Sequence, residues 1–261
     1  MTKRVFAMLL AVLMLCLCVA CSDNGNDGTT DDPVINIGPE TLTYTDSQGD
    51  TFTYEYLSST TVAITDFVGS DEPHVVTIPA AIDGRNVPEI ASAAFRAKSN
   101  ISEIKSDAAL VKIGDYAFAY CEALTTVTLP ETVKTIGKCA FYASAHLTTV
   151  VMPQGLENIN EAAFYGCTSL TGVTFPASLK TIGAMAFLDC TSLTSIVLPE
   201  GITSVGAQAF YDCTAVETLS LPASLTEIGD YAFNPIVRNL PDEAITVVEG
   251  SVAAKHIAQF R

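Results

Sequence analysis

Histidine and carboxylate side chains are the groups in this sequence that could bind a metal ion or act as general acids and bases. The three histidines, His74, His146 and His256, have no metal-ligand spacing, and none lies beside an obvious nucleophile. A hydrolase would need two carboxylates brought together from separate segments. The candidate glutamates are spread along the chain at Glu131, Glu157, Glu200, Glu217 and Glu227. We therefore predict no catalytic residue, no metal site and no cofactor, with a carboxylate-dependent hydrolase as the least favoured alternative.

Composition narrows the function classes further. The 261 residues are 49% hydrophobic, which is enough for a sizeable core, and 29 acidic residues against 13 basic ones give a net charge of -16. A negative charge of this size repels phosphate backbones and anionic lipid headgroups. Nucleic acid is thus not expected as a partner, and a membrane could be reached only through a covalent anchor.

The N-terminal residues have the layout of an export signal. Residues 1–20 combine a basic start, an apolar run too short for a membrane span of about 20 residues, and a small residue at the end. The segment Cys18-Val19-Ala20-Cys21 resembles the lipobox of bacterial lipoproteins, with Cys18 where that family usually has leucine. The resemblance implies a lipid on Cys21, and ordinary secretion is the alternative.

The segment that follows the signal indicates where the protein is placed. Residues 21–40 are predicted to form a flexible acidic tether, similar to the surface-export signal of Bacteroidetes lipoproteins. We expect an outer-membrane lipoprotein exposed on the cell surface. The periplasmic face of the membrane, or release as a secreted protein, is the alternative.

Phenylalanine recurs every 23 residues through most of the chain. The positions are Phe95, Phe118, Phe141, Phe164, Phe187, Phe210 and Phe233. A fixed period of this length is typical of stacked repeats, in which a unit buries its apolar face only against its neighbours. We therefore predict a continuous ladder of buried rings.

One unit, LTTVTLPETVKTIGKCAF from Leu124 to Phe141, shows the pattern in full. Val127 and Leu129 alternate with threonines, which predicts a short strand, and Pro130 ends it. The spacing L-x-x-V-x-L, V-x-x-I and A-F resembles leucine-rich repeats, and the proline with G-x-x-A-F resembles their BspA-like subgroup of bacterial surface proteins. The resemblance implies an α/β-type, mostly β solenoid: a right-handed superhelix of seven 23-residue coils with a parallel concave sheet and short helical turns.

Two further positions recur just before the phenylalanines. The first unit has Ala91 four residues before its ring. Four residues before the rings from Phe118 to Phe233 stand five glycines and one asparagine: Gly114, Gly137, Asn160, Gly183, Gly206 and Gly229. Because glycine and asparagine tolerate positive φ, we predict a left-handed kink there before the helical turn. Alanine directly precedes every phenylalanine, which predicts close approach of neighbouring coils.

The exposed ends of the stack need covers. Residues 41–66 alternate threonine with aromatic residues around a Ser-Gln-Gly-Asp turn, which predicts a β-hairpin cap. Residues 67–240 are predicted to form the solenoid. Residues 241–261 are predicted to form a C-terminal cap whose helix begins at Ser251. An insertion at residues 83–87 should change the shape of the first coil.

Four cysteines, Cys121, Cys167, Cys190 and Cys213, stand three residues after a phenylalanine, and Ser144 fills this place in another unit. Adjacent coils would bring the last three within disulfide range, although three in a row cannot all pair. Buried thiols that act as small apolar fillers are the favoured interpretation. A disulfide among Cys167, Cys190 and Cys213 stays open.

The outward strand positions form a nearly uncharged strip rich in hydroxyls. Its candidate ligand-binding residues are Thr126, Thr128, Thr149, Val151, Thr174, Ser195, Val197, Thr218 and Ser220. Threonine and valine also simply suit strands. A second row, Tyr142, Tyr165 and Tyr211, could bind a ligand or cover the coil edge.

Because BspA-like proteins include adhesins, the resemblance implies a non-catalytic surface module that binds an extracellular protein or glycan. We expect it to act as a monomer that touches the membrane only through its lipid. A structural or scaffolding lipoprotein of the envelope is the alternative.

Overall fold

The computed structural model describes residues 41–260, which belong to one compact unit. The predicted signal, the lipidation at Cys21 and the tether lie outside the described residues. Within the part that is described, no helix has the length and apolarity needed to cross a membrane.

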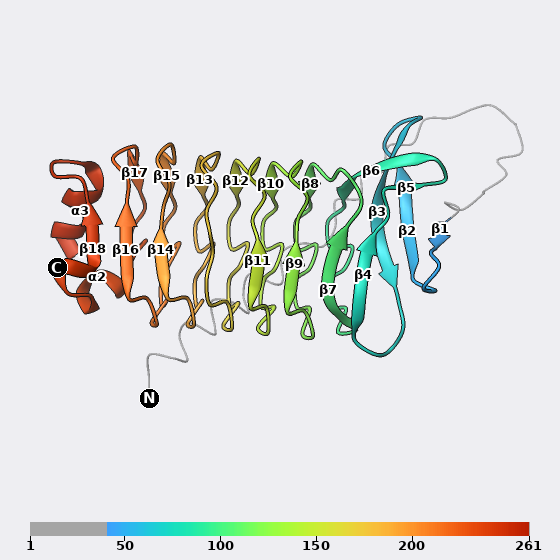
Figure 1. The fold of residues 1–261 in the computed structure, drawn as a ribbon, viewed down its shortest axis with the longest axis horizontal. Helices are drawn as coiled ribbons and strands as arrows, with labels where there is room; N and C mark the ends of the chain where they lie inside the picture. Colours follow the sequence, from blue (N-terminus) through green and yellow to red (C-terminus); the bar gives the residue numbers. More distant parts are fainter. Residues whose placement is uncertain (1–40, 261) are drawn as a thin grey trace, which may run out of the picture. The chain divides into compact units, whose positions relative to one another are not determined.

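The chain winds into successive coils that lie side by side in sequence order (Figure 1). One parallel ladder, the long ladder, joins β3 (Thr61–Val68), β6 (Arg85–Ile90), β8 (Lys112–Ile113), β10 (Thr135–Ile136), β12 (Asn158–Ile159), β13 (Thr181–Ile182), β15 (Ser204–Val205) and β17 (Glu227–Ile228). From β6 onwards, facing residues are 23 apart, as in the pair Thr135 and Asn158. The mostly β solenoid with parallel sheets predicted from the repeat is confirmed.

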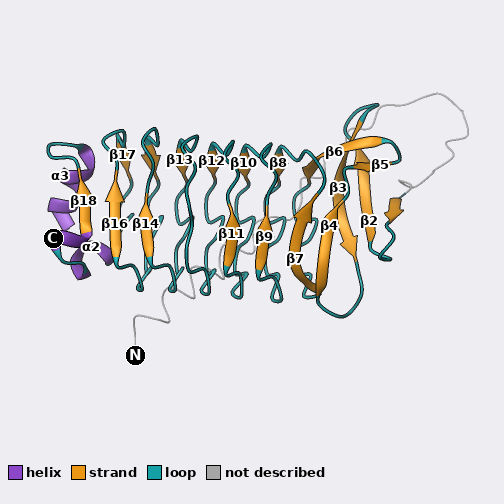
Figure 2. Cartoon of the chain, viewed as in Figure 1, coloured by secondary structure: helices purple, strands orange, loops and turns teal. Residues whose placement is uncertain are grey.

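A second parallel ladder, the strip ladder, carries the predicted strip. Its first part joins β4 (His74–Ile78), β7 (Ile101–Ser106), β9 (Thr126–Thr128) and β11 (Thr149–Val151), and its second part joins β14 (Ser195–Val197), β16 (Thr218–Leu221) and β18 (Ile245–Val247). The parallel sheet expected from the repeat therefore forms in two parts, divided between β11 and β14 (Figure 2).

The phenylalanine ladder is confirmed. All seven rings are fully buried. Successive centroids lie between 5.0 Å (Phe95 to Phe118) and 5.5 Å (Phe210 to Phe233) apart, and the rings from Phe118 onwards are nearly parallel. Phe67 and Phe52 extend the stack into the N-terminal cap with centroid distances of 5.1 Å and 5.4 Å. One aromatic core thus runs through every coil.

The predicted left-handed kink at the recurring glycines is wrong. Positive φ occurs instead two residues before each ring and, from Phe95 to Phe210, also two residues after it, for example at Tyr116 (58°) and Tyr120 (60°). The glycines are needed for close approach, because a Cβ on Gly137 would lie 2.6 Å from the backbone carbonyl carbon of Gly114 in the preceding coil. Sequence alone identifies the small residue, but not which of these two reasons requires it.

The predicted short helical turns are also absent from the coils. Around Phe118 the N–H groups alternate: Phe118 N donates to Ala140 O in the next coil at 2.7 Å, while Ala119 N donates to Tyr116 O at 3.1 Å. These consecutive tight turns form a third set of hydrogen bonds between coils. Within residues 41–260, helices occur only at the C-terminal end: α2 (Ile236–Asn239) follows the last coil, before the expected cap boundary, and η2 (Asp242–Ala244) and α3 (Val252–Phe260) lie in the cap.

The two caps follow the predicted chemistry with shifted boundaries. β1 (Leu42–Thr45) and β2 (Thr51–Tyr56) form the expected antiparallel hairpin. β2 also pairs with β3, so the expected boundary at residue 66 falls inside a strand of the solenoid. The insertion folds as the antiparallel pair β5 (Ala81–Ile82) and β6. At the other end, the Ser251 hydroxyl accepts a hydrogen bond from Ala254 N at 3.1 Å and caps α3.

An ion pair fastens the hairpin to the first coil. His74 Nε2 lies 2.9 Å from Asp50 Oδ1, and Asp50 is 2% exposed. His74 Nδ1 lies 3.0 Å from the Glu72 carbonyl oxygen. Both ring nitrogens therefore face acceptors, which favours the imidazolium. Burial opposes this charge, but the hydrogen bonds to Glu72 and Asp50 outweigh it and raise the pKa of His74.

This ion pair should make the N-terminal cap less stable as pH rises. Because the folded pKa is raised, the stabilisation is complete below the unfolded value of about 6.5 and is lost as pH rises through the folded pKa. Hydrogen exchange at Thr51 should show more opening of the hairpin at about pH 8 than at about pH 6, after correction for intrinsic rates. Asp50→Asn should remove the difference. An NMR titration that places His74 at or below its ordinary pKa would contradict the expectation.

Candidate binding strip

The structure brings the predicted strip residues together in two groups. Thr126 faces Thr149 and Thr128 faces Val151 across β9 and β11, whereas Ser195 faces Thr218 and Val197 faces Ser220 across β14 and β16. Thr174 lies between the groups, outside any strand. The side chains are exposed or half-buried, and the alternating residues Val127, Val150, Ile196 and Leu219 are buried. The period-two prediction is therefore confirmed wherever strands form.

A neighbouring row of threonines, missed by the sequence reasoning, has a structural role. Thr125 Oγ1 donates to Ser102 O at 3.0 Å, Thr148 to Thr125 O at 3.1 Å and Thr194 to Thr171 O at 3.1 Å. The offset of 23 residues is the signal that could have revealed it. We call these residues the clamp threonines, because each hydroxyl joins two coils.

The strip hydroxyls, in contrast, remain available. Within the described residues, no protein hydrogen-bond partner occurs for the side chains of Thr126, Thr128, Thr174, Ser195, Thr218 and Ser220. Thr149 Oγ1 has only a 3.5 Å contact with Thr148 Oγ1. The sole charges at these strand positions, Glu103 and Lys105, lie at the N-terminal end and pair with each other at 3.5 Å. The strip is thus a surface of open hydroxyls without a net charge.

Comparison with known families matches residues 88–192 and 157–241 to the BspA type leucine-rich repeat region, described as six copies. The chain belongs to the BspA-type leucine-rich repeat family. Among solved structures it is similar to the T. pallidum leucine-rich repeat protein, with 26% identity, a TM-score of 0.52 and coverage of 80% of this chain and 92% of that one.

A leucine-rich repeat protein from Bacteroides ovatus is also similar, at 28% identity and a TM-score of 0.53. That likeness covers 69% of this chain, which spans about half (54%) of the Bacteroides ovatus protein. A comparison with curated protein sequences finds no match.

The tyrosine row of this BspA-type chain packs against itself. Tyr142 and Tyr165 stack with centroids 4.8 Å apart, and Tyr120 lies 5.4 Å from Tyr142. Burial raises the pKa of Tyr142 to about 12. Leu188 occupies the next place and separates Tyr211 from the stack. Tyr142 and Tyr165 therefore cover each other's ring faces at the coil edge, whereas Tyr211 lies outside this stack.

The cysteines of the described repeats are free thiols, all of them buried. Cys167 Sγ donates to Phe141 O at 3.2 Å and Cys190 Sγ to Phe164 O at 3.3 Å. Ser144 Oγ makes the equivalent bond to Phe118 O at 2.9 Å. The interpretation as buried fillers is confirmed, and the hydrogen bond explains why serine can replace cysteine at this position. No disulfide occurs among the cysteines of residues 41–260.

These thiols should be unreactive in the folded protein. Burial raises the pKa of Cys121 and of Cys213 to about 12, which leaves almost no thiolate near neutral pH. A thiol-specific chromogenic reagent at about pH 8 should modify none of the five until denaturant is added. Cys190→Ser should preserve stability better than Cys190→Ala, because only serine keeps a donor to Phe164 O. Rapid labelling of the native chain would contradict the buried placement.

The histidines do not form a site. His146 Nδ1 lies 2.7 Å from Glu122 O, and the His256 ring packs edge-on against Phe233. Ser70 Oγ lies 3.1 Å from His74 Nδ1, but both groups face the Glu72 carbonyl, so this nitrogen donates and cannot accept the serine proton. The Ser70 hydroxyl is therefore not activated as a nucleophile.

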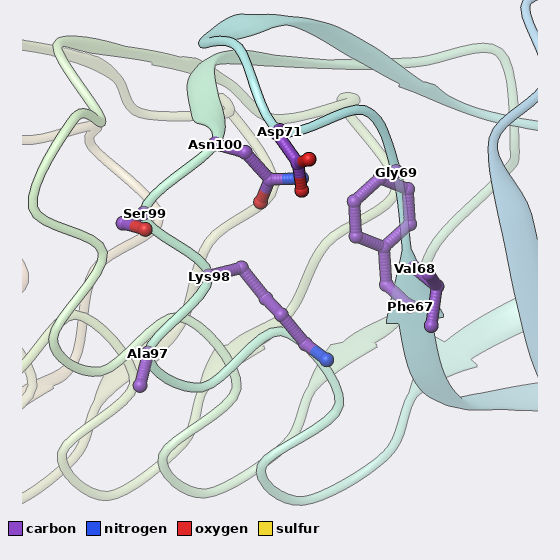
Figure 3. Close-up of a pocket in the computed structure, with 8 residues that line it drawn as sticks. All are labelled: Phe67, Val68, Gly69, Asp71, Ala97, Lys98, Ser99 and Asn100. Carbon is purple, nitrogen blue, oxygen red and sulfur yellow. The ribbon is translucent and has the colours of Figure 1, made fainter.

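A shallow cavity of about 280 Å³ opens beside the loop that contains Ser70 and Glu72 (Figure 3). Asp71, Lys98 and Asn100 line it together with Phe67. Lys98 Nζ is already paired with Asp66 Oδ1 at 2.9 Å, and Asn100 Nδ2 donates a hydrogen bond to the Ser70 carbonyl oxygen at 2.5 Å. Lys98 and Asn100 therefore already have partners within the protein. Among the described residues, no cluster of three or more His, Cys, Asp or Glu could hold a metal ion.

Proposed function

We propose that the chain is a non-catalytic binding module displayed at the cell surface, and that its ligand, an extracellular protein or glycan, docks on the strip. The observation that supports this most directly is the contrast between two rows of hydroxyls. The clamp threonines bond to neighbouring coils, whereas six strip residues beside them keep their hydroxyls unbonded. Stability alone does not require these free groups.

The chemistry of the strip suits docking with little loss of ion hydration. Val151 is 48% exposed and Val197 57%, so apolar contacts are available between the hydroxyls. A surface without net charge avoids the desolvation penalty that buried ions carry. The family membership is consistent with this role, and the lipid at Cys21 would hold the module at the outer membrane.

Lysine substitutions on the strip test this proposal. Thr126→Lys, Thr149→Lys and Thr218→Lys together should abolish capture of ligands from arrays of matrix proteins and glycans, because they place three charges on the docking surface. The matched control is Thr214→Lys, an exposed threonine away from the strip. Thermal unfolding should be alike for both variants. Unchanged capture by the triple variant would exclude the strip as the binding surface.

Protease treatment of intact cells tests the location. The natural chain should be digested at the surface, and Cys21→Ser should release it from the membrane fraction. Protection of the natural chain until the outer membrane is opened would instead place it on the periplasmic face.

A further inference from the structure

The strip ladder is interrupted at its middle coil. Residues Gly172–Thr174 occupy the strand position between β11 and β14, yet only an isolated bridge between Thr149 and Gly172 joins them to a neighbour. Figure 2 shows loop, and no arrow, at this place. Among the described residues, no hydrogen-bond partner occurs for the backbone N–H and C=O groups of Val173 and Thr174. Such groups need a partner or solvent.

The cause of the break lies in two substitutions within the repeat. Gly172 replaces the threonine or serine of the neighbouring coils, and Phe175 replaces their leucine or methionine. The buried Phe175 ring packs edge-on against Phe187 of its own coil at 5.6 Å and against Phe210 of the next coil at 6.2 Å. Val173 is left half-buried, whereas the equivalent Val127 is fully buried. The larger ring therefore takes core space and displaces the segment from the ladder.

The surroundings of the break leave its backbone accessible. Gly172 and Thr174 are exposed, and a Cβ on Gly172 would meet nothing within 4 Å. Val151 and Val197, the most exposed apolar side chains of the strip, flank the break on its two sides. Free backbone donors and acceptors thus lie between two apolar contacts.

We propose that Gly172–Thr174, with Val151 and Val197, forms the centre of the ligand site and takes an extended polypeptide segment of a partner protein. This inference rests on the proposed function and narrows its ligand class. An extended peptide supplies alternating N–H and C=O groups to the unpaired backbone and apolar side chains to the two valines. The strip between Thr126 and Ser220 offers no charged side chain for ionic recognition and no aromatic ring for stacking a sugar.

Restoring the ladder tests the inference. In Gly172→Thr/Phe175→Leu the coil regains the residues of its neighbours, and hydrogen exchange should show new protection of the Val173 and Thr174 amides. The probes are a displayed library of random linear peptides and a glycan array, both applied to the full chain. Peptides selected on the natural chain should bind the restored chain about tenfold more weakly, as the loss of one to two hydrogen bonds predicts.

A second variant keeps the inference testable if the first variant does not fold. Val151→Asp/Val197→Asp changes only exposed side chains and should also weaken peptide binding, whereas Thr214→Lys should not. Undiminished binding in both double variants, or capture of glycans without any peptide, overturns this inference. If the three lysine substitutions still abolish capture in that case, the proposed function stands, and only the central position of Gly172–Thr174 or the peptide nature of the ligand is wrong.

Discussion

Replacing Phe164 by alanine should lower the free energy of unfolding by about 3 to 5 kcal/mol. The ring is fully buried and stacks on Phe141 and Phe187 with centroids 5.1 Å away on either side. Neighbouring rings belong to rigid coils, so they cannot collapse into the space that is left. Urea denaturation followed by circular dichroism measures the loss.

Two further variants calibrate this result. Phe164→Leu keeps most of the apolar volume and should cost about 1.5 kcal/mol. Val197→Ala removes an exposed side chain and should change stability by no more than about 0.5 kcal/mol. Equal denaturation midpoints for Phe164→Ala and Val197→Ala would show that the aromatic stack does not stabilise the fold.

Replacing Gly206 by alanine should cost about 2 to 3 kcal/mol, because the added Cβ would lie 2.3 Å from the backbone nitrogen of Ala184 in the preceding coil. Backbone atoms cannot move aside as a flexible side chain can. The coils must therefore separate locally, which strains the long ladder on both sides. Asn160 has a side chain at the equivalent position of its own coil, which shows that the stack of coils can partly accommodate one. The expected loss of stability is therefore smaller than a rigid overlap of atoms would cause.

Gly172→Ala is the matched control for this substitution. It adds the same methyl group at a glycine where nothing lies within 4 Å, and we expect a change within about 0.5 kcal/mol. Thermal melts of the two variants should thus differ clearly. A Gly206→Ala protein as stable as Gly172→Ala would mean that the coils are not in close contact at the recurring glycines.

The repeat made the fold predictable from the sequence. The period of 23 residues placed the rings of Phe95 to Phe233 in register, and the alternation at Val127 and Leu129 identified the inward side of a strand. Serine and glycine near residues 46 to 50 marked a hairpin, and Ser251 marked the start of α3. These inferences depended on local patterns that a single unit already contains.

Features that depend on contacts between units were not predicted. The tight turns around Tyr116 and Tyr120 place non-glycine residues at positive φ, because their N–H groups bond alternately to the next coil and to their own. The clamp role of Thr125 and Thr148 likewise appears only when two coils are adjacent. The break at Gly172–Thr174 coincides with Gly172 and Phe175, and the apolar pattern treats the second of these substitutions as conservative.

The 23-residue offset between facing strand residues of the interior coils bears on how such a gene can change. Thr135 pairs with Lys112 on one side and with Asn158 on the other. Excision of one complete winding between them would therefore bring Asn158 beside Lys112 without shifting any remaining pair. Recombination between repeats can therefore lengthen or shorten the molecule in whole windings, while the two caps and the outward side chains of the remaining coils stay unchanged.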